Sequence, residues 1–274
     1  MKTRAYFAPV NAAEWRGMPP CDRCSIHRVG GGSMMSGGER ASGMGLIVHA
    51  DETVNAFGQD RWIIAHRAGF RPCPWAYQVA KFCELRAGDK IADLGCGAGA
   101  LMIAVHALCP DVGQLVGVEY DERYADQSRR NLILNEIVQG TVLRADIRSI
   151  PLRTEYDVVV TNPPFYPPNW GRQSTNLSRA RATHALHGDI VDFVGAAQHC
   201  LTPHGQLVVI YDSHRLTELM LACARWGMIV RKLRFLDDDK QRPSRVLLNA
   251  VRQGVGVVVD RRSFEVQGDL QWLT

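Results

Sequence analysis

The chain has 274 residues, 46% hydrophobic content and a formal net charge of +4, from 32 basic and 28 acidic residues. This length suits one large α/β domain with at most a modest appendage, and the mild positive charge is compatible with a nucleic-acid partner without requiring one. There is no apolar run of eighteen residues and no basic-then-apolar N-terminal pattern. These absences argue against a membrane span or a secretory signal and predict a cytoplasmic protein.

The first 45 residues differ from the rest because glycine and serine dominate between Gly30 and Gly43. We expect residues 1–45 to form a disordered leader. Within it, Cys21, Cys24 and His27 have the spacing of half a zinc site, but no further ligand is suitably placed, so we expect no metal. The eight cysteines lie at unrelated spacings, which favours free thiols over a disulfide framework.

Regular structure is predicted to resume at residue 46. Residues 46–85 read as an N-terminal cap, with a short strand at Trp62–Ile64 and a helix over Pro74–Leu85. Residues 86–260 then form the main domain, and residues 261–274 a C-terminal tail. No internal repeat or second domain is visible, and we expect a monomer.

The main domain opens with an apolar strand, Lys90–Leu94, that contains Asp93 and runs into three alternating glycines. The glycines permit a sharp turn and a close approach of a ligand to the backbone. Apolar residues at helical spacing follow over Leu101–Leu108. This strand, loop and helix begin a doubly wound α/β sheet.

The glycine spacing distinguishes a dinucleotide site from a site for a cationic ligand. A dinucleotide site has its third glycine one residue later, and Asp93 beside the loop would repel a pyrophosphate but attract a cationic ligand. The motif resembles the first motif of S-adenosylmethionine-dependent methyltransferases, Asp-x-Gly-x-Gly-x-Gly. This resemblance implies a Rossmann-like class I fold, with a seven-stranded, mostly parallel sheet and an antiparallel terminal strand. It also implies S-adenosylmethionine as cofactor, bound by Asp93, Gly95, Cys96, Gly97 and Gly99.

Two further strands end in acids. Leu115–Glu119 places a carboxylate where it can accept both ribose hydroxyls. Thr141–Asp146 places another where the family hydrogen-bonds the adenine amino group, although Asp146 could equally be a helix or turn cap. The neighbouring residues that the resemblance adds to the cofactor site are Tyr120 and Ile147.

The most specific motif is Asn162-Pro163-Pro164-Phe165, directly after the buried strand Tyr156–Thr161. Two prolines hold the backbone rigid and leave the Pro163 carbonyl free to accept a hydrogen bond, and the Asn162 side chain offers a second acceptor. Two acceptors aimed at one planar amino group would orient its nitrogen lone pair toward a methyl carbon, while Phe165 stacks on the ring. These four residues are therefore the predicted catalytic residues, and Asn162 is also expected at the cofactor.

The motif resembles that of methyltransferases acting on amino or amide nitrogens of adenine, cytosine, guanine or glutamine. Methyl transfer from a sulfonium needs positioning more than acid–base groups. The connection over 166–188 carries no acid and several arginines, which suit a polyanion such as RNA. The predicted substrate-binding residues are Tyr166, Arg172, Arg179 and Arg181.

Two segments resemble the family that methylates adenine N6 in valine tRNA. One is Gly69-Phe70-Arg71, in which Arg71 closes over the cofactor, and the other is Arg242–Ala250. The chain departs from the family after Arg71, where Cys73-Pro74-Trp75 replaces the usual Asp, and Arg71 could equally be a surface arginine. Adenine N6 in tRNA is the predicted acceptor. Guanine N2 in rRNA, glutamine N5 in a protein and a non-catalytic RNA-binding role are the alternatives.

The remaining elements complete the sheet. We expect a helix over Ile190–Leu201, a strand over Gln206–Ile210 and a helix over Leu216–Trp226. Met228–Phe235 and Arg245–Val251 then read as the antiparallel pair that ends this fold.

Overall fold

The structure, a computed structural model, describes residues 36–67, 72–153, 155–164, 188–237 and 242–252. Its centre is a seven-stranded sheet in the order β5-β4-β3-β6-β7-β9-β8. The first five strands in this order are parallel, and β9 is antiparallel to both β7 and β8. In sheet order the strands are Gly140–Arg144, Gln114–Glu119, Lys90–Leu94, Tyr156–Thr161, Leu201–Asp212, Pro243–Arg252 and Met228–Asp237. The predicted doubly wound sheet with an antiparallel end is confirmed.

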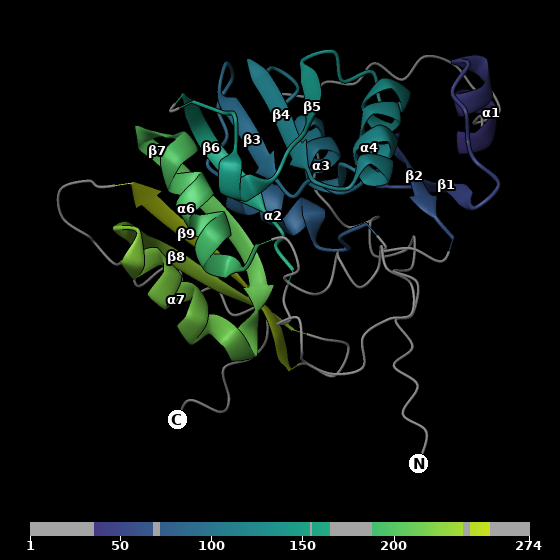
Figure 1. Ribbon diagram of the computed structural model, residues 1–274. Coiled ribbons are helices and arrows are strands. Elements are labelled where there is room, and N and C mark those ends of the chain that lie inside the picture. The colour runs from purple at the N-terminus through teal and green to yellow at the C-terminus, as the bar shows by residue number, and fades with distance from the viewer. Residues whose placement is uncertain (1–35, 68–71, 154, 165–187, 238–241, 253–274) are drawn as a thin grey trace.

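Helices cover both faces of this sheet (Figure 1). The helices α2 (Ala76–Phe82), α3 (Ala100–Leu108) and α4 (Glu122–Leu134) pack on one face, around Ile91, Leu115 and Val158. The helices α6 (Ile190–Cys200) and α7 (Leu216–Arg225) pack on the other, around Ala92, Val116 and Val159. Because both faces are buried, these strands are nearly continuous apolar runs. Among the described residues, no helix is long and apolar enough to cross a bilayer.

Helix α4 was not predicted, and its composition explains why. Half of its buried positions are polar, so apolar residues mark its inner face only in part. The buried polar residues are Gln127, Ser128, Arg130 and Asn131, and the buried apolar ones are Tyr124, Ala125, Leu132 and Leu134. Asp121 caps the helix by accepting a hydrogen bond from the backbone N–H of Arg123 at 3.0 Å. The polar part of the inner face holds the N-terminal part of the chain.

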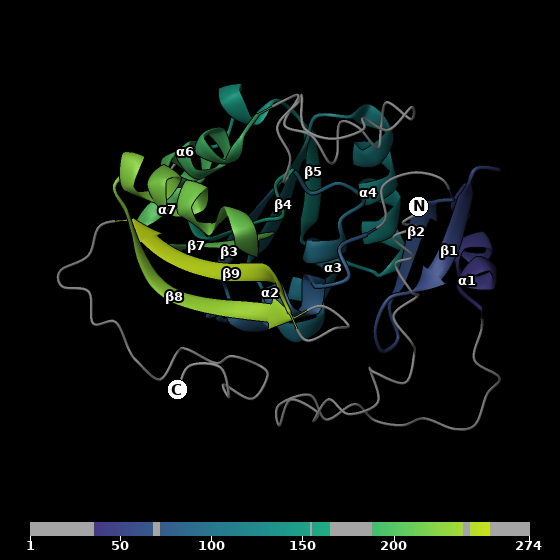
Figure 2. The same ribbon diagram turned by 90° about the horizontal axis from the view of Figure 1, so that it is seen from below.

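That N-terminal part consists of α1 (Gly37–Gly43) and a hairpin of β1 (Glu52–Ala56) and β2 (Trp62–His66). Figure 2 shows this hairpin beside α4, outside the main sheet. The expectation of disorder through residue 45 is wrong for α1. A capping box between Ser36 and Glu39 starts the helix, and the Arg40 guanidinium donates to the Leu134 carbonyl at 2.9 Å. Residues 1–35, including Cys21, Cys24 and His27, and residues 253–274, including the predicted tail, lie outside the described residues.

A buried ion pair joins β1 to α4. The Glu52 carboxylate is 1% exposed and accepts hydrogen bonds from Arg130 Nη1 at 2.7 Å and Nη2 at 2.8 Å. The His49 backbone N–H donates a third bond at 2.9 Å and Gln127 Nε2 a fourth at 2.8 Å. Burial opposes ionisation of Glu52, but these hydrogen bonds outweigh it and lower its pKa from 4.5 to about 2. The hairpin is thus attached to α4 through a charge that is fully hydrogen-bonded.

Candidate active site

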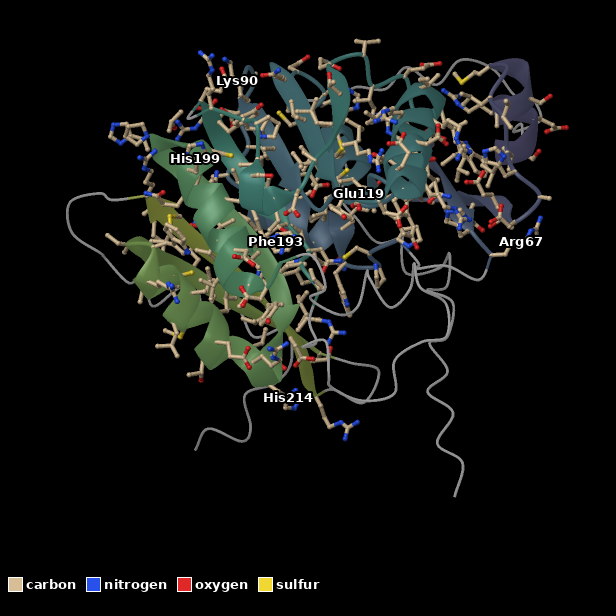
Figure 3. All side chains as sticks on the ribbon, viewed as in Figure 1. Arg67, Lys90, Glu119, Phe193, His199 and His214 are labelled. Carbon is tan, nitrogen blue, oxygen red and sulfur yellow. The ribbon has the colours of Figure 1, made fainter. Side chains whose placement is uncertain are left out.

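The predicted motifs meet at the carboxyl edge of the sheet. Strand β3 lies between β4 and β6, with Leu94 opposite both Val118 and Thr161. The residues that follow these strands, from Gly95, Glu119 and Asn162 onward, therefore converge on one place. In Figure 3, Glu119 at the end of β4 lies well away from Lys90, which begins β3 at the opposite edge.

The glycine loop, residues 95–99, makes the sharp turn that its glycines predicted. Gly95, Gly97 and Gly99 have φ values of +73°, +54° and +83°, in the left-handed region that favours glycine. A Cβ on Gly99 would lie 2.6 Å from Ser128 Oγ, so α4 requires glycine there, whereas a Cβ on Gly97 would meet no atom within 4 Å. Gly97 thus faces open space, as expected where a ligand approaches the backbone.

Glu119 holds this loop from the end of β4. One carboxylate oxygen accepts from the Gly97 N–H at 2.8 Å, and the other accepts from the Asp121 N–H at 2.9 Å. Burial raises the pKa of Glu119 even though these backbone N–H groups favour the ionised form. The side chain is therefore held in one orientation, with lone pairs left to accept two hydroxyl groups of a ribose.

Asp93 is completely buried, and neither carboxylate oxygen has a hydrogen-bond partner in the described part of the chain. Burial, together with the negative charge of Glu119, raises its pKa well above 3.8. A cationic ligand beside the loop would stabilise the ionised form of this carboxyl group. The orphaned carboxylate therefore fits the ammonium and sulfonium groups of S-adenosylmethionine.

Cys96 has a packing position in the loop. It is 6% exposed, and its Sγ lies 3.8 Å from Ser128 Oγ. Burial, with Asp93 and Glu119 nearby, raises the pKa of this thiol well above 9.0, so it stays neutral and unreactive.

Asp146 follows β5, and its carboxylate is engaged by Arg148. The backbone N–H of Arg148 donates to Oδ1 at 2.9 Å, which caps η1 (Ile147–Ser149), and the Arg148 guanidinium binds both oxygens. Asp146 is therefore a cap, and an adenine amino group would have to share its carboxylate with Arg148. Of its predicted neighbours, Tyr120 is 42% exposed and Ile147 is 6% exposed.

The Asn-Pro-Pro motif lies next to the glycine loop. The Thr161 hydroxyl donates to the Leu94 carbonyl at 2.7 Å and so joins the end of β6 to the end of β3. The following Asn162 has a buried side-chain oxygen with no partner among the described residues, and Pro163 is buried. An acceptor left unsatisfied at this edge is suited to receive a hydrogen bond from a substrate amino group.

Part of the predicted site belongs to segments that the structure does not describe. Six predicted residues lie outside the described residues: Arg71, Phe165, Tyr166, Arg172, Arg179 and Arg181. Conversely, sequence reasoning missed Thr161, Gly117 and Phe193. A Cβ on Gly117 would lie 2.7 Å from Cys96 Sγ, and one on Gly95 would lie 3.1 Å from the Phe193 ring. Only Thr161 carried a signal, since it directly precedes the motif. The described residues contain no group of three or more His, Cys, Asp or Glu side chains that could hold a metal ion.

The fold and this site define a Rossmann-like class I methyltransferase. The chain resembles a predicted O-methyltransferase from Agrobacterium tumefaciens with a TM-score of 0.51 and 22% identity, over 66% of this chain and 82% of that one. It resembles a SAM-dependent methyltransferase from Aquifex aeolicus with a TM-score of 0.51 and 15% identity, over 66% and 95%. At these identities the likeness concerns the fold.

The chain belongs to the methyltransferase small domain family, which matches residues 79–224. The predicted enzyme class and its cofactor, S-adenosylmethionine, are thereby confirmed. Three relatives carry the name tRNA1(Val) (adenine(37)-N6)-methyltransferase. The one from Aeromonas hydrophila is 25% identical over 51% of this chain and 58% of its own length. Those from Tolumonas auensis and Yersinia pestis are 26% and 29% identical, over 62% and 60% of this chain and 71% and 67% of their own lengths.

Proposed function

We propose that this protein transfers a methyl group from S-adenosylmethionine to the N6 amino group of an adenine in tRNA. The cofactor supplies an electrophilic methyl carbon. The new N–C bond forms as the C–S bond breaks, and the amino nitrogen then loses one proton to water. No side chain is required as a base, because the proton becomes acidic once the nitrogen is methylated. The protein contributes by orienting the amino nitrogen toward the methyl carbon.

The observation that carries the proposal is the unsatisfied Asn162 side-chain oxygen. It is buried, it has no partner in the described part of the chain, and it follows β6, whose end Thr161 joins to the end of β3. An exocyclic amino group donates two hydrogen bonds, and Asn162 with the Pro163 carbonyl would accept both. The nitrogen lone pair would then face the cofactor side of the site.

The choice of adenine in tRNA is supported by the relatives, whose names specify that acceptor. It is also supported by the arginines predicted to contact substrate after the motif, because arginine forks match phosphate oxygens. A base in a tRNA loop can be splayed out more cheaply than one in a duplex. A tRNA substrate would also agree with the predicted cytoplasmic location and with a protein that acts as a monomer without a metal.

The test is mass spectrometry of nucleosides from unmodified tRNA incubated with the enzyme and S-adenosylmethionine. We expect N6-methyladenosine with the parent, and a loss of about a hundredfold or more in rate with Asn162→Ala, in the range of removing one positioned polar group at a reacting centre. Asn249→Ala serves as the control, since the side-chain oxygen of Asn249 is also buried without a partner among the described residues but lies within β9.

The other acceptors are outcomes of the same experiment. A methyl group found on guanine, or on a protein glutamine with none in tRNA, would refute adenine and leave the methyltransferase assignment intact. Binding of RNA without any methyl transfer would indicate the non-catalytic alternative.

A further inference from the structure

The hairpin β1–β2 is joined to α4 by two asparagines. Their side-chain amides make the hydrogen bonds to β2 that the backbone of a neighbouring strand would make. Asn131 Oδ1 accepts from the Ile64 N–H at 2.6 Å, and its Nδ2 donates to the Ile64 carbonyl at 3.0 Å. Asn135 does the same at Trp62, accepting at 3.0 Å and donating at 2.7 Å. Each side-chain amide thus satisfies both backbone groups of one strand residue.

The spacing explains why asparagines four apart serve this purpose. Four residues along a helix rise about 6 Å, and two residues along a strand rise about 6.6 Å. Consecutive turns of α4 therefore meet alternate residues of β2, whose polar groups point to the same side. Asn131 and Asn135 are 0% and 2% exposed, so these bonds are made away from water, where an unpaired group is costly.

The two asparagines differ in their third hydrogen bond. Asn135 Nδ2 also donates to the Asn131 carbonyl, within α4, at 2.8 Å. Asn131 Nδ2 instead donates to the Ala98 carbonyl at 2.9 Å, and Ala98 belongs to the glycine loop. One buried amide therefore contacts both the hairpin and the loop that receives the cofactor.

The Ala98 carbonyl needs such a tether because glycines flank it. Glycine restricts its backbone angles less than any other residue type. The peptide units between Gly97 and Gly99 could therefore rotate at small cost. Three other bonds of the loop come from β4: Val118 accepts from the N–H groups of Gly95 and Cys96, and Glu119 accepts from that of Gly97. Within the loop, the N–H of the Ala98–Gly99 peptide donates to the Cys96 carbonyl at 2.8 Å. The Asn131 bond to Ala98 anchors the loop from the opposite side.

We propose that Asn131 is a positioning residue for S-adenosylmethionine, which it serves by fixing the Ala98 peptide and by making the N-terminal hairpin a support of the glycine loop. This inference depends on the proposed function only through its cofactor. An enzyme that binds S-adenosylhomocysteine but methylates no adenine would refute the proposed acceptor and leave the role of Asn131 standing.

The experiment compares Asn131→Asp with Asn135→Asp in the full chain. Each variant keeps one acceptor for β2 and loses the donors, but only the first loses the bond to Ala98. S-adenosylhomocysteine binding is measured by calorimetry, and unfolding by urea. We expect Asn131→Asp to weaken binding about tenfold, the effect of one buried hydrogen bond, and Asn135→Asp to change it less than twofold at a similar loss of stability.

A second readout does not involve the cofactor. Hydrogen–deuterium exchange of the peptide that contains Gly97 and Gly99 is expected to accelerate in unliganded Asn131→Asp and to match the parent in Asn135→Asp. The pair Asn131→Ala and Asn135→Ala repeats the comparison without a buried charge. Equal effects of the two positions on binding or on loop exchange would overturn the inference. Failure of both Asn131 variants to fold, with the Asn135 variants folded, would also overturn it, because the amide would then hold the fold as a whole.

Discussion

Replacing Glu52 by Gln should destabilise the protein strongly and in a pH-dependent way. The carboxylate is 1% exposed and accepts bonds from both terminal nitrogens of Arg130. Its pKa falls from 4.5 in the unfolded chain to about 2, and at 1.36 kcal/mol per pKa unit this corresponds to about 3 kcal/mol of stability at pH 7. Gln preserves the shape but leaves the buried Arg130 guanidinium with the half-exposed Asp126 as its remaining counter-charge. Breaking a buried ion pair in this way typically costs about 3–5 kcal/mol.

The sign of the pH dependence follows from the lowered pKa. The folded state holds its proton less tightly than the unfolded state, so the contribution is complete above pH 4.5 and is lost as the pH falls toward 2. Urea unfolding of parent and Glu52→Gln should therefore differ by about 3 kcal/mol at pH 7 and by roughly half of that near pH 3.

The control is Asp126→Asn. Asp126 also pairs with Arg130, at 2.8 Å, but its side chain is 48% exposed, so its removal should cost less than about 1 kcal/mol. Parent and Glu52→Gln of equal stability at pH 7, or a difference that does not shrink at acid pH, would refute the account of this ion pair.

Two further predictions concern the ends of β3 and β6. Thr161→Val should cost about 1–3 kcal/mol of unfolding free energy, because the Leu94 carbonyl loses the hydroxyl that donates to it at 2.7 Å; Thr161→Ser, which keeps that donor, should cost less, and the reverse order in urea unfolding would contradict the assignment. Because burial raises the pKa of Asp93 above 3.8, the free protein should lose stability as the pH rises toward that pKa. Asp93→Asn should remove this pH dependence, so the melting temperatures of parent and variant should diverge as the pH rises. A variant whose stability depends on pH as the parent's does would show that the carboxylate is compensated.

The sequence alone determined the order of the elements in the main domain and the chemistry of its motifs. Buried parallel strands are apolar along their whole length, and turns at their carboxyl ends carry glycine, proline and acids for local backbone reasons. The turn over Gly95, Gly97 and Gly99 could therefore be predicted from spacing, as could the acid at Glu119 and the rigid motif at Asn162. These features depend on residues close together in the chain.

The tertiary structure decided what depends on residues far apart. Helix α4 was not predicted from periodicity because half of its buried positions are polar, among them Arg130 and Asn131. Such side chains are stable inside only when partners from another segment satisfy them. The partners, Glu52 and Ile64, come from a hairpin more than sixty residues earlier. Helix α1 did carry a local signal, the capping box of Ser36 and Glu39, within a glycine-rich stretch, but the acceptor of its Arg40 on Leu134 is visible only in the fold. Local sequence patterns predict a buried apolar face. Buried polar residues can be recognised only when both partners of their hydrogen bonds are known.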